Sequence, residues 1–325
     1  MIACPAVADV RLRSKLFAHA RRWAPWLIGI VIIAVLIKRI PLAAFRGAIG
    51  HGPHLLLASV DLGVMIATLC SDSLATWIGL IELKMRRPFK HVIVVRGATY
   101  LLVLLNYAVG QGGFGYYLHR SGATPMRATG ATLFLIGTNL AALLVATPAS
   151  WLLLGVAPLN NTMWWTVVIG CSGLGLYLVV IQIAPAVLQR RQLFEPLFAA
   201  GVRGHVVSIL GRVPHVAMIV FGQWVALRAW GIEVPLVVAA TVMPAVAIAS
   251  SLPISPGGLG TSQAALVYFF ADYAVGTTSD DRTATVLAFS IAHFVYSMLA
   301  SVVVGFGCAP FAKRVTPPVS EPEPG

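Results

Sequence analysis

The chain has 325 residues, of which 58% are hydrophobic and 10% charged, and its mean hydropathy is +0.85. Soluble domains carry roughly 25% charged residues, so this composition excludes a soluble globular protein and indicates an integral membrane protein. The net charge of +12 does not indicate nucleic-acid binding, because the basic residues flank apolar segments. That distribution sets the topology of membrane proteins and attracts anionic lipid headgroups.

The ends of the chain differ from its middle. Residues 1–23 are a basic segment that we expect on the cytoplasmic side, 24–311 form one polytopic membrane domain, and 312–325 form a disordered cytoplasmic tail. The first apolar stretch resembles a signal peptide, but Lys38 and Arg39 follow it at once, so we interpret it as a retained anchor. The cysteines are too scattered for a disulfide framework or a metal site. We therefore expect no metal and no cofactor.

Eight apolar segments follow one another along the chain, and they cover residues 24–40, 54–83, 92–118, 128–150, 162–188, 204–230, 234–275 and 284–309. If all of them crossed the membrane once, Arg120, Arg127 and the arginines between 190 and 203 would lie outside, against the positive-inside rule. The conflict disappears if 92–118 and 234–275 are re-entrant helical hairpins. The sequence thus predicts an all-α membrane protein with six full crossings and two hairpins that enter from opposite faces, as in an inverted repeat.

Two glycine-rich clusters lie inside these hairpin segments. The first contains Gly110, Gly112, Gly113 and Gly115. The second is Ser255, Pro256, Gly257, Gly258, Leu259, Gly260 and Thr261. Irregular backbone at membrane depth is tolerated only inside protein or beside a water-filled cavity, so we expect breaks here that surround a polar site. Thr261 would cap the following helix, whose N-terminus suits an anion. The alternative is that these glycines only allow close helix packing.

Arg212 lies far from both ends of its apolar segment, where a charge is expensive and normally has a partner. We expect an anion beside it: Asp61, Asp272 or a lipid phosphate. Asp61 and Asp272 are also our candidate proton carriers.

Four further polar residues in apolar segments have simpler explanations. We expect Arg96 and Arg228 to extend towards the headgroups from segment ends. Asp72 would cap a helix, and His215 would bond a carbonyl freed by Pro214.

The glycine motifs resemble those of the membrane region of lysylphosphatidylglycerol synthases, a flippase-like family that includes many bacterial and archaeal membrane proteins. Asn106-x-x-x-Gly110-x-Gly112-Gly113 with Arg120 downstream is similar to the family's asparagine–glycine stretch, and Pro256–Gly260 is similar to its PGGLG turn. The resemblance covers about residues 25–310. The family often has a glutamate shortly after the turn, where this chain has Gln263. The resemblance implies a location in the bacterial or archaeal plasma membrane, and the charge distribution predicts that both termini are cytoplasmic.

The resemblance and the glycine breaks together favour a lipid transporter that moves a phospholipid or a polyprenyl-linked lipid between leaflets. The expected substrate-binding residues are Asn106, Gly110, Gly112, Gly113, Arg120, Arg212, Ser255, Pro256, Gly257, Gly258, Gly260, Thr261 and Gln263. Membrane lipids are the expected partners, together with a lipid-modifying enzyme. The alternatives are an intramembrane enzyme that acts on a lipid-linked phosphate or sugar, and a non-catalytic subunit of a lipid-synthesis complex.

Overall fold

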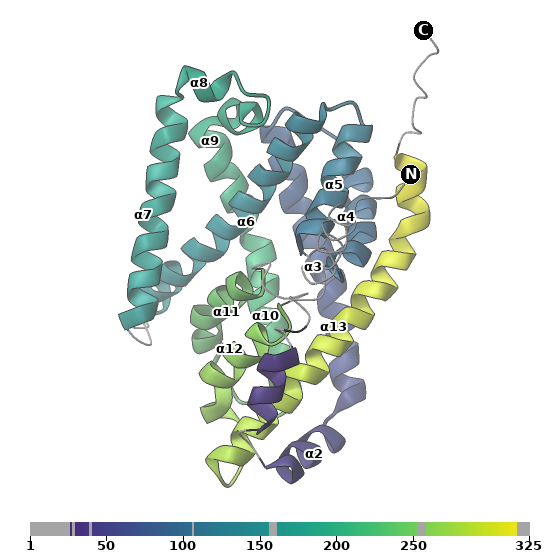
Figure 1. Ribbon diagram of the computed structural model, residues 1–325, viewed down its shortest axis with the longest axis vertical. Helices are drawn as coiled ribbons and strands as arrows, with labels where there is room; N and C mark the ends of the chain where they lie inside the picture. Colours follow the sequence, from purple (N-terminus) through teal and green to yellow (C-terminus); the bar gives the residue numbers. More distant parts are fainter. Residues whose placement is uncertain are drawn as a thin grey trace, which may run out of the picture.

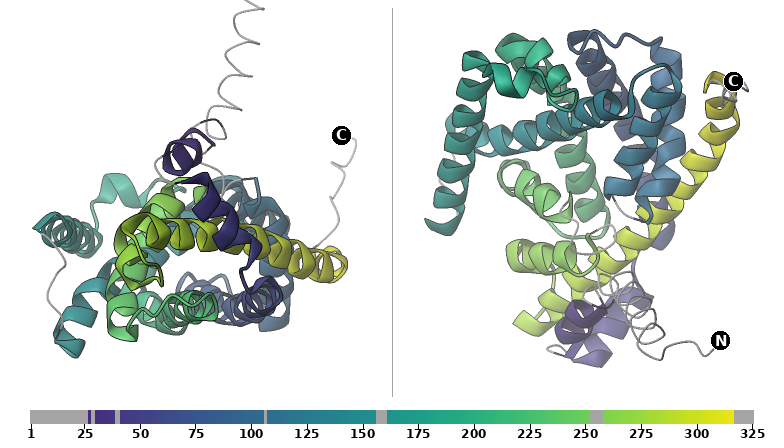
Figure 2. Two further views of the ribbon diagram at one scale, coloured as in Figure 1. Left: turned by 90° about the horizontal axis from the view of Figure 1, so that it is seen from below. Right: turned by 45° about the horizontal axis from the view of Figure 1, so that its top comes forward.

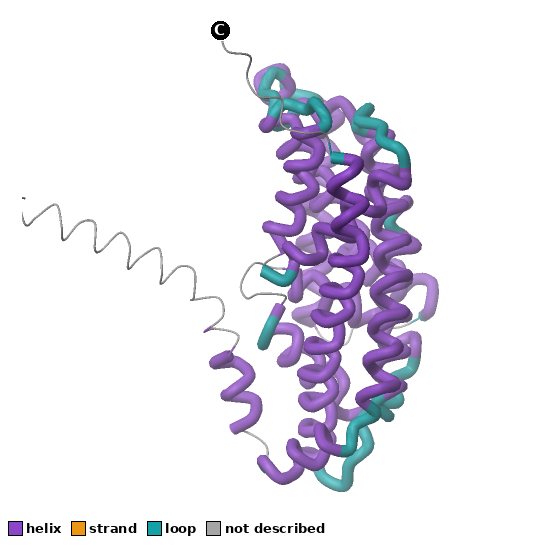
Figure 3. Tube along the Cα trace, turned by 90° about the vertical axis from the view of Figure 1, so that its right-hand side faces the viewer, coloured by secondary structure: helices purple, strands orange, loops and turns teal. Residues whose placement is uncertain are grey.

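The computed structural model describes residues 27, 30–38, 41–105, 107–155, 161–251 and 258–316, without the side chains of residues 162 and 249. In this part of the chain the elements are helices, and a single bridge between Ile232 and Ala274 is the one strand-like pairing there. Residues 30–38 are helical. They are followed by α2 (Leu42–Gly50), α3 (His54–Glu82), α4 (Phe89–Val103), α5 (Tyr107–Arg120), α6 (Pro125–Leu154), α7 (Asn161–Ile183), α8 (Ala186–Gln189), α9 (Glu195–Gly211), α10 (Val213–Ala229), α11 (Leu236–Ser251), α12 (Thr261–Phe270), the short 3₁₀ helix η2 (Ala271–Tyr273) and α13 (Ser279–Val315). The predicted all-α class is confirmed (Figure 3).

Five of these helical segments are long and apolar enough to cross a membrane: α3, α6, most of α7, the α9–α10 pair and α13. α3 alone has 29 residues, which at about 1.5 Å per residue exceeds the roughly 30 Å thickness of a bilayer core. The five segments coincide with the second to the sixth predicted crossings. The first predicted crossing, 24–40, lies largely outside the described residues. This is the architecture of a multi-pass membrane protein.

Two pairs of helices are too short to span. α4 and α5 have 15 and 14 residues and pack against each other, while α11 and α12 have 16 and 10. In Figure 1 the α4–α5 pair lies in the upper half of the molecule and the α11–α12 pair in the lower half. Figure 2 shows the same separation from a tilted view. Both segments that we expected to form hairpins are therefore helix pairs at opposite ends of the long axis.

The first glycine cluster is not a break, which corrects our expectation. Gly110, Gly112, Gly113 and Gly115 all lie within α5, and the chain turns earlier, between Val103 and Tyr107. A Cβ on Gly115 would lie 2.7 Å from Oγ1 of Thr132 on α6. None of these glycines has a positive φ angle. Gly110, Gly113 and Gly115 let α5 lie close to its neighbours, so the packing alternative accounts for these three.

The second cluster does interrupt the helix. α11 ends at Ser251 and α12 begins at Thr261. Gly258 and Gly260 have φ angles of 75° and 86°, a region that other residues rarely adopt. Ser255, Pro256 and Gly257 lie outside the described residues, as does Asn106.

A matched pair of substitutions separates close packing from other roles of the first cluster. A Cβ on Gly110 would lie 3.2 Å from the backbone nitrogen of Val103, which cannot move aside without shifting α4. Nothing lies within 4 Å of a Cβ on Gly112. We expect Gly110→Ala to destabilise the protein by about 1–3 kcal/mol through overpacking, whereas Gly112→Ala should not destabilise it, because alanine has the higher helix propensity. Thermal unfolding in detergent compares the two, and equal stability would contradict the packing role.

Two apolar clusters fill the interior at different depths. The upper cluster contains Leu80, Phe114 and Phe134, and the lower one contains Leu57 and Phe289. Along α3, Asp61 and Asp72 lie between Leu57 and Leu80. Asp61 and Asp72 therefore mark a polar layer between these two apolar regions.

Candidate functional site

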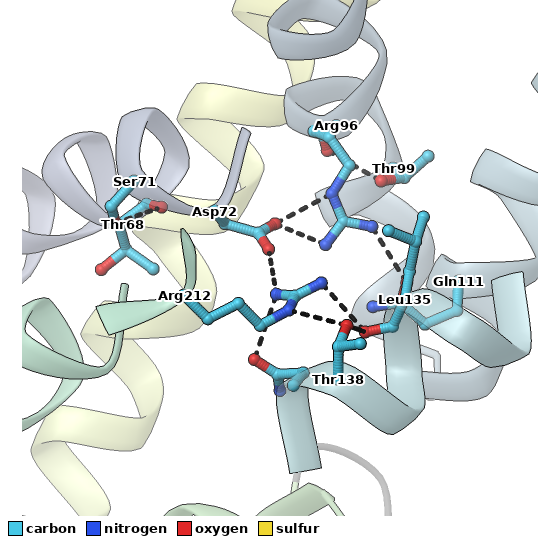
Figure 4. A network of polar contacts seen from close by, with 10 residues as sticks. Thr68, Ser71, Asp72, Arg96, Thr99, Gln111, Leu135, Thr138 and Arg212 are labelled. Atoms are coloured by element: carbon cyan, nitrogen blue, oxygen red, sulfur yellow. Dashed lines mark hydrogen bonds and ion pairs between the residues drawn. The ribbon is translucent and has the colours of Figure 1, made fainter. Parts of the chain in front are cut away.

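Asp72 is the centre of a buried polar network in the middle of α3. Its exposed fraction is 3%. One carboxylate oxygen, Oδ2, accepts from Nε of Arg96 at 2.8 Å and also from Nη2 of Arg96. The other, Oδ1, accepts from Nη1 of Arg212 at 3.3 Å. Figure 4 shows the Asp72 carboxylate joined to both guanidinium groups, with that of Arg96 beside it and that of Arg212 below it.

Arg212 lies at the junction of α9 and α10, where Pro214 prevents the regular hydrogen-bond pattern. Its guanidinium is fixed by α6, because Nη2 donates to the Leu135 carbonyl at 2.9 Å and Nη1 to Oδ1 of Asn139 at 3.2 Å. Nε points to Oγ1 of Thr138 at 3.4 Å. These acceptors are neutral, so they orient the guanidinium without cancelling its charge.

Arg96 is held from α3 and α5. It extends from α4, and its Nη1 donates to Oε1 of Gln111 at 3.0 Å. Two donor atoms already contact one oxygen of Asp72, so this pair is the tighter of the two ion pairs. Through this hydrogen bond from Arg96, Gln111 connects the glycine-rich helix α5 to the network.

The network borders a cavity of about 190 Å³. The lining residues are Met65, Thr68, Asp72, Arg96, Tyr100, Val103, Tyr107, Gln111, Leu135, Asn139, Arg212, His215 and Ser301. Two guanidiniums face one carboxylate, so with His215 neutral the lining carries one excess positive charge. Nδ1 of His215 is buried and has no hydrogen-bond partner. A buried, uncompensated charge is costly, and a phosphate or other oxyanion in this cavity would neutralise it.

Our sequence-based expectations for these residues need four corrections. Asp72 is not a helix cap, because it lies inside α3 and binds two arginines. Arg96 does not extend to the headgroups, because it is buried with an exposed fraction of 6%. Arg212 does have an anionic partner at depth, as expected, but this partner is Asp72 instead of Asp61 or Asp272. His215 lines the cavity, and Nδ1 bonds no carbonyl.

Other expected site residues lie elsewhere. Arg120 is at the end of α5, where its guanidinium lies over the ring of Tyr116. Asp272 is exposed in η2. Arg228 lies over the ring of Trp224 near the end of α10, consistent with the expected position close to the headgroups. Gly112 and Gly115 line a separate shallow pocket.

Ser262 and Gln263, the two residues that follow the second glycine cluster, line a different cavity, again of about 190 Å³. Oε1 of Gln263 accepts the Gly260 N–H at 2.5 Å and so caps α12 from within. Thr261 instead donates its hydroxyl to the Gly258 carbonyl at 3.0 Å. The amide oxygen of Gln263 is sufficient for this cap, so the cap alone does not require a carboxylate at position 263. We call this the lower cavity, and the one beside Asp72 the upper cavity.

An apolar cavity of about 430 Å³ lies between α6, α7 and α9. Its lining includes Leu133, Leu144, Gly173 and Ile209. Thr138 also lines it, and the hydroxyl of the same residue contacts Arg212. The apolar cavity and the charged site therefore meet at one position on α6.

Comparison with known proteins adds no family to this description. No protein-family model matches the chain, and no curated protein or solved structure matches it either. Among the described residues, no three or more His, Cys, Asp or Glu side chains are grouped so as to hold a metal ion. The function is therefore argued from the site itself.

Proposed function

We propose that this protein moves a lipid with an anionic headgroup, a phospholipid or a polyprenyl-linked lipid, between the two leaflets of a membrane. The observation that carries the proposal is the charge of the upper cavity. Arg96 and Arg212 face Asp72 alone, at a depth where an unmatched charge is expensive. A phosphate group matches both the excess charge and the donor geometry of guanidinium.

The apolar cavity supports a lipid over a free anion. Thr138 lines the apolar cavity, and its hydroxyl contacts Arg212, which lines the upper cavity. A ligand with its headgroup beside Arg212 can therefore place an acyl or prenyl chain between α6 and α7. α7 also exposes large apolar side chains such as Trp165, Ile169 and Leu176, as a helix in contact with lipid would.

The two helix pairs support a transport pathway. We propose that α4–α5 and α11–α12 are re-entrant hairpins from opposite faces, which gives the two halves an inverted relation like that of many transporters. Basic residues gather in the loops next to α4 and α6 and at the end of α13, among them Lys84, Arg86, Arg87, Lys313 and Arg314. From the positive-inside rule we propose that this end, with the C-terminus, faces the cytoplasm of a bacterial or archaeal cell.

The resemblance to the membrane region of lysylphosphatidylglycerol synthases supports the same function. Gly258 and Gly260 of this motif both have positive φ angles, which glycine adopts without strain. On this proposal the protein works beside an enzyme that makes or modifies the lipid it carries.

The test is a leaflet-resolved assay in proteoliposomes. Fluorescent phosphatidylglycerol and phosphatidylcholine are placed in the inner leaflet, and their arrival outside is followed with a membrane-impermeant quencher. We expect the protein to raise the rate of movement between leaflets more for the anionic lipid than for the zwitterionic one. Equal rates with and without protein, for phosphatidylglycerol and for polyprenyl phosphate, would refute the proposal.

The apolar cavity has its own prediction. Gly173 lines the cavity and Gly175 does not, although both lie in α7, and a Cβ added to either glycine would meet no atom within 4 Å. A side chain therefore begins in open space at both positions. We expect Gly173→Leu to slow lipid transport several-fold by filling the space for a chain, while Gly175→Leu keeps the wild-type rate. Equal rates in the same proteoliposome assay would show that this cavity holds no part of the lipid.

A further inference from the structure

A second buried ionisable pair lies on α3 and α13, away from the arginines. Nδ1 of His293 and Oδ1 of Asp61 are 2.8 Å apart, although the two residues are 232 positions apart in sequence. The Asp61 side chain is 1% exposed and that of His293 is 20% exposed. The second oxygen of Asp61, Oδ2, is buried without a hydrogen-bond partner. Solvent therefore reaches this buried pair at His293 and not at the carboxylate of Asp61.

His293 faces the lower cavity, whose lining is rich in small polar groups. Ser250, Ser262 and Ser290 each donate their hydroxyl proton to a backbone carbonyl, so their oxygen lone pairs remain as acceptors. Nε2 of Gln223, also in the lining, is buried and lacks an acceptor. A polar cavity of about 190 Å³ is large enough for several water molecules. Water there can bring a proton to His293.

Charge favours a proton at this pair. With neutral His293 and ionised Asp61 the pair carries one buried negative charge, held by a single hydrogen bond, which is costly. One added proton makes the pair neutral overall. That proton passes from a hydronium ion in the cavity to Nε2 of His293, while Nδ1 keeps its hydrogen bond to Asp61. On release the same proton returns to cavity water, and no other bond changes.

Among the described residues, no lysine or arginine of the neighbouring elements forms an ion pair with Asp61. On α3, His54 bonds the Ile49 carbonyl and contacts the ring of Tyr296 on α13. On α10, Arg228 lies over Trp224. Asp72 on α3, Arg96 on α4 and His215 on α10 line the upper cavity. Glu82, Lys313 and Arg314 lie at the far ends of α3 and α13. Other titratable or charged groups on the elements that pack here include Arg46 on α2, His51 at its C-cap, Tyr268 on α12, Asp272 and Tyr273 on η2, and Asp280, Asp281 and Arg282 at the start of α13.

The pair is connected to the upper cavity along two helices. On α13, His293 and Ser297 line the lower cavity and Ser301, one turn further, lines the upper one. On α10, His215 lines the upper cavity and Gln223 the lower one. Ser301 also contacts Sδ of Met65, which lies between Asp61 and Asp72 on α3. The two polar sites are thus adjacent parts of one interior layer.

We propose that Asp61 and His293 form a proton-binding site that is loaded from the lower cavity and is coupled to the occupancy of the arginine site. The coupling part rests on the proposed function. The excess positive charge of the empty upper cavity disfavours a proton on the pair. An anionic headgroup removes that charge, so headgroup binding and proton binding support each other, and by reciprocity the effect is equal in both directions.

The proton site is tested without transport. Magnetic resonance of isotope-labelled histidine, recorded in nanodiscs over a pH series, reports whether Nε2 of each histidine carries a proton. We expect a signal from His293 that changes with pH and disappears in His293→Gln. Asp61→Asn keeps a hydrogen-bond acceptor but no charge, and it should weaken proton binding at least tenfold. His51→Gln, on the exposed end of α2, is the control and should leave the His293 signal unchanged. A His293 titration unaffected by Asp61→Asn would overturn the proton site.

The coupling is tested by adding a short-chain phosphatidylglycerol to the same samples at fixed pH. We expect the protonated fraction of His293 to rise, and short-chain phosphatidylcholine to have no effect. If calorimetry shows that the lipid binds but the protonated fraction of His293 does not change, the coupling alone would be overturned. Absence of any binding heat for phosphatidylglycerol and polyprenyl phosphate would overturn both the coupling and the proposed function, and the proton site would stand.

Discussion

Replacing Asp72 with asparagine is expected to lower the free energy of unfolding by about 3–5 kcal/mol, the cost of leaving buried charges without their partner. Asp72 is the carboxylate that both Arg96 and Arg212 contact. Asparagine has nearly the same shape, so the loss would come from charge and not from packing. The measurement is unfolding in mixed detergent micelles, followed by circular dichroism.

The control for this prediction is Asp272→Asn. Asp272 is exposed in η2, and substitutions at such surface positions usually change stability by less than about 0.5 kcal/mol. The double variant Asp72→Asn with Arg96→Gln again carries one net positive charge, as the native network does. It should therefore be more stable than Asp72→Asn alone. If Asp72→Asn were as stable as Asp272→Asn, the network would not contribute to the fold.

The helical class and most of the crossings could be predicted from the sequence, because length and hydropathy alone decide whether a helix can span a membrane. The position of the first bend could not. Gly110 and Gly113 are compatible both with a break and with close packing, and the choice depends on Val103 and Leu102, which a Cβ at those glycines would meet. The second break could be predicted, since Gly258 and Gly260 follow two prolines that end a helix.

The site was only partly predictable for a related reason. Arg212 could be singled out because its depth in a segment is visible in the sequence. Its partner could not, because Asp72 is 140 positions away and nothing in the local pattern pairs them. Arg96 lies near the start of an apolar segment, so the sequence indicated a side chain at the membrane surface. α4 begins at Phe89, about two turns before Arg96, and this places the guanidinium beside α3 in the interior. Ion pairs between helices are a property of the tertiary fold.

The substitution Arg212→Gln is expected to have the largest effect on transport. Arg96 makes the tighter contact with Asp72, so Arg212, with one contact at 3.3 Å and three neutral acceptors, supplies the charge that remains for a ligand. A hydrogen bond to a charged group contributes about 1.5–3 kcal/mol, and about 1.4 kcal/mol corresponds to tenfold in affinity. We expect anionic-lipid transport to fall roughly tenfold to a hundredfold, with little change for a zwitterionic lipid.

Two further variants separate charge from structure. Arg228→Gln removes an arginine from the same α9–α10 segment, but that side chain lies over Trp224 and not in the network, so headgroup preference should not change. Arg212→Lys keeps the charge but loses the planar pair of donors, and it should keep the preference for anionic lipid at a reduced rate. Glutamine at 212 leaves Arg96 and Asp72 as a neutral pair, so a folding defect is not expected. If Arg212→Gln and Arg228→Gln had the same transport rates for each of the two lipids, the excess charge of the upper cavity would contribute to the fold and not to headgroup binding.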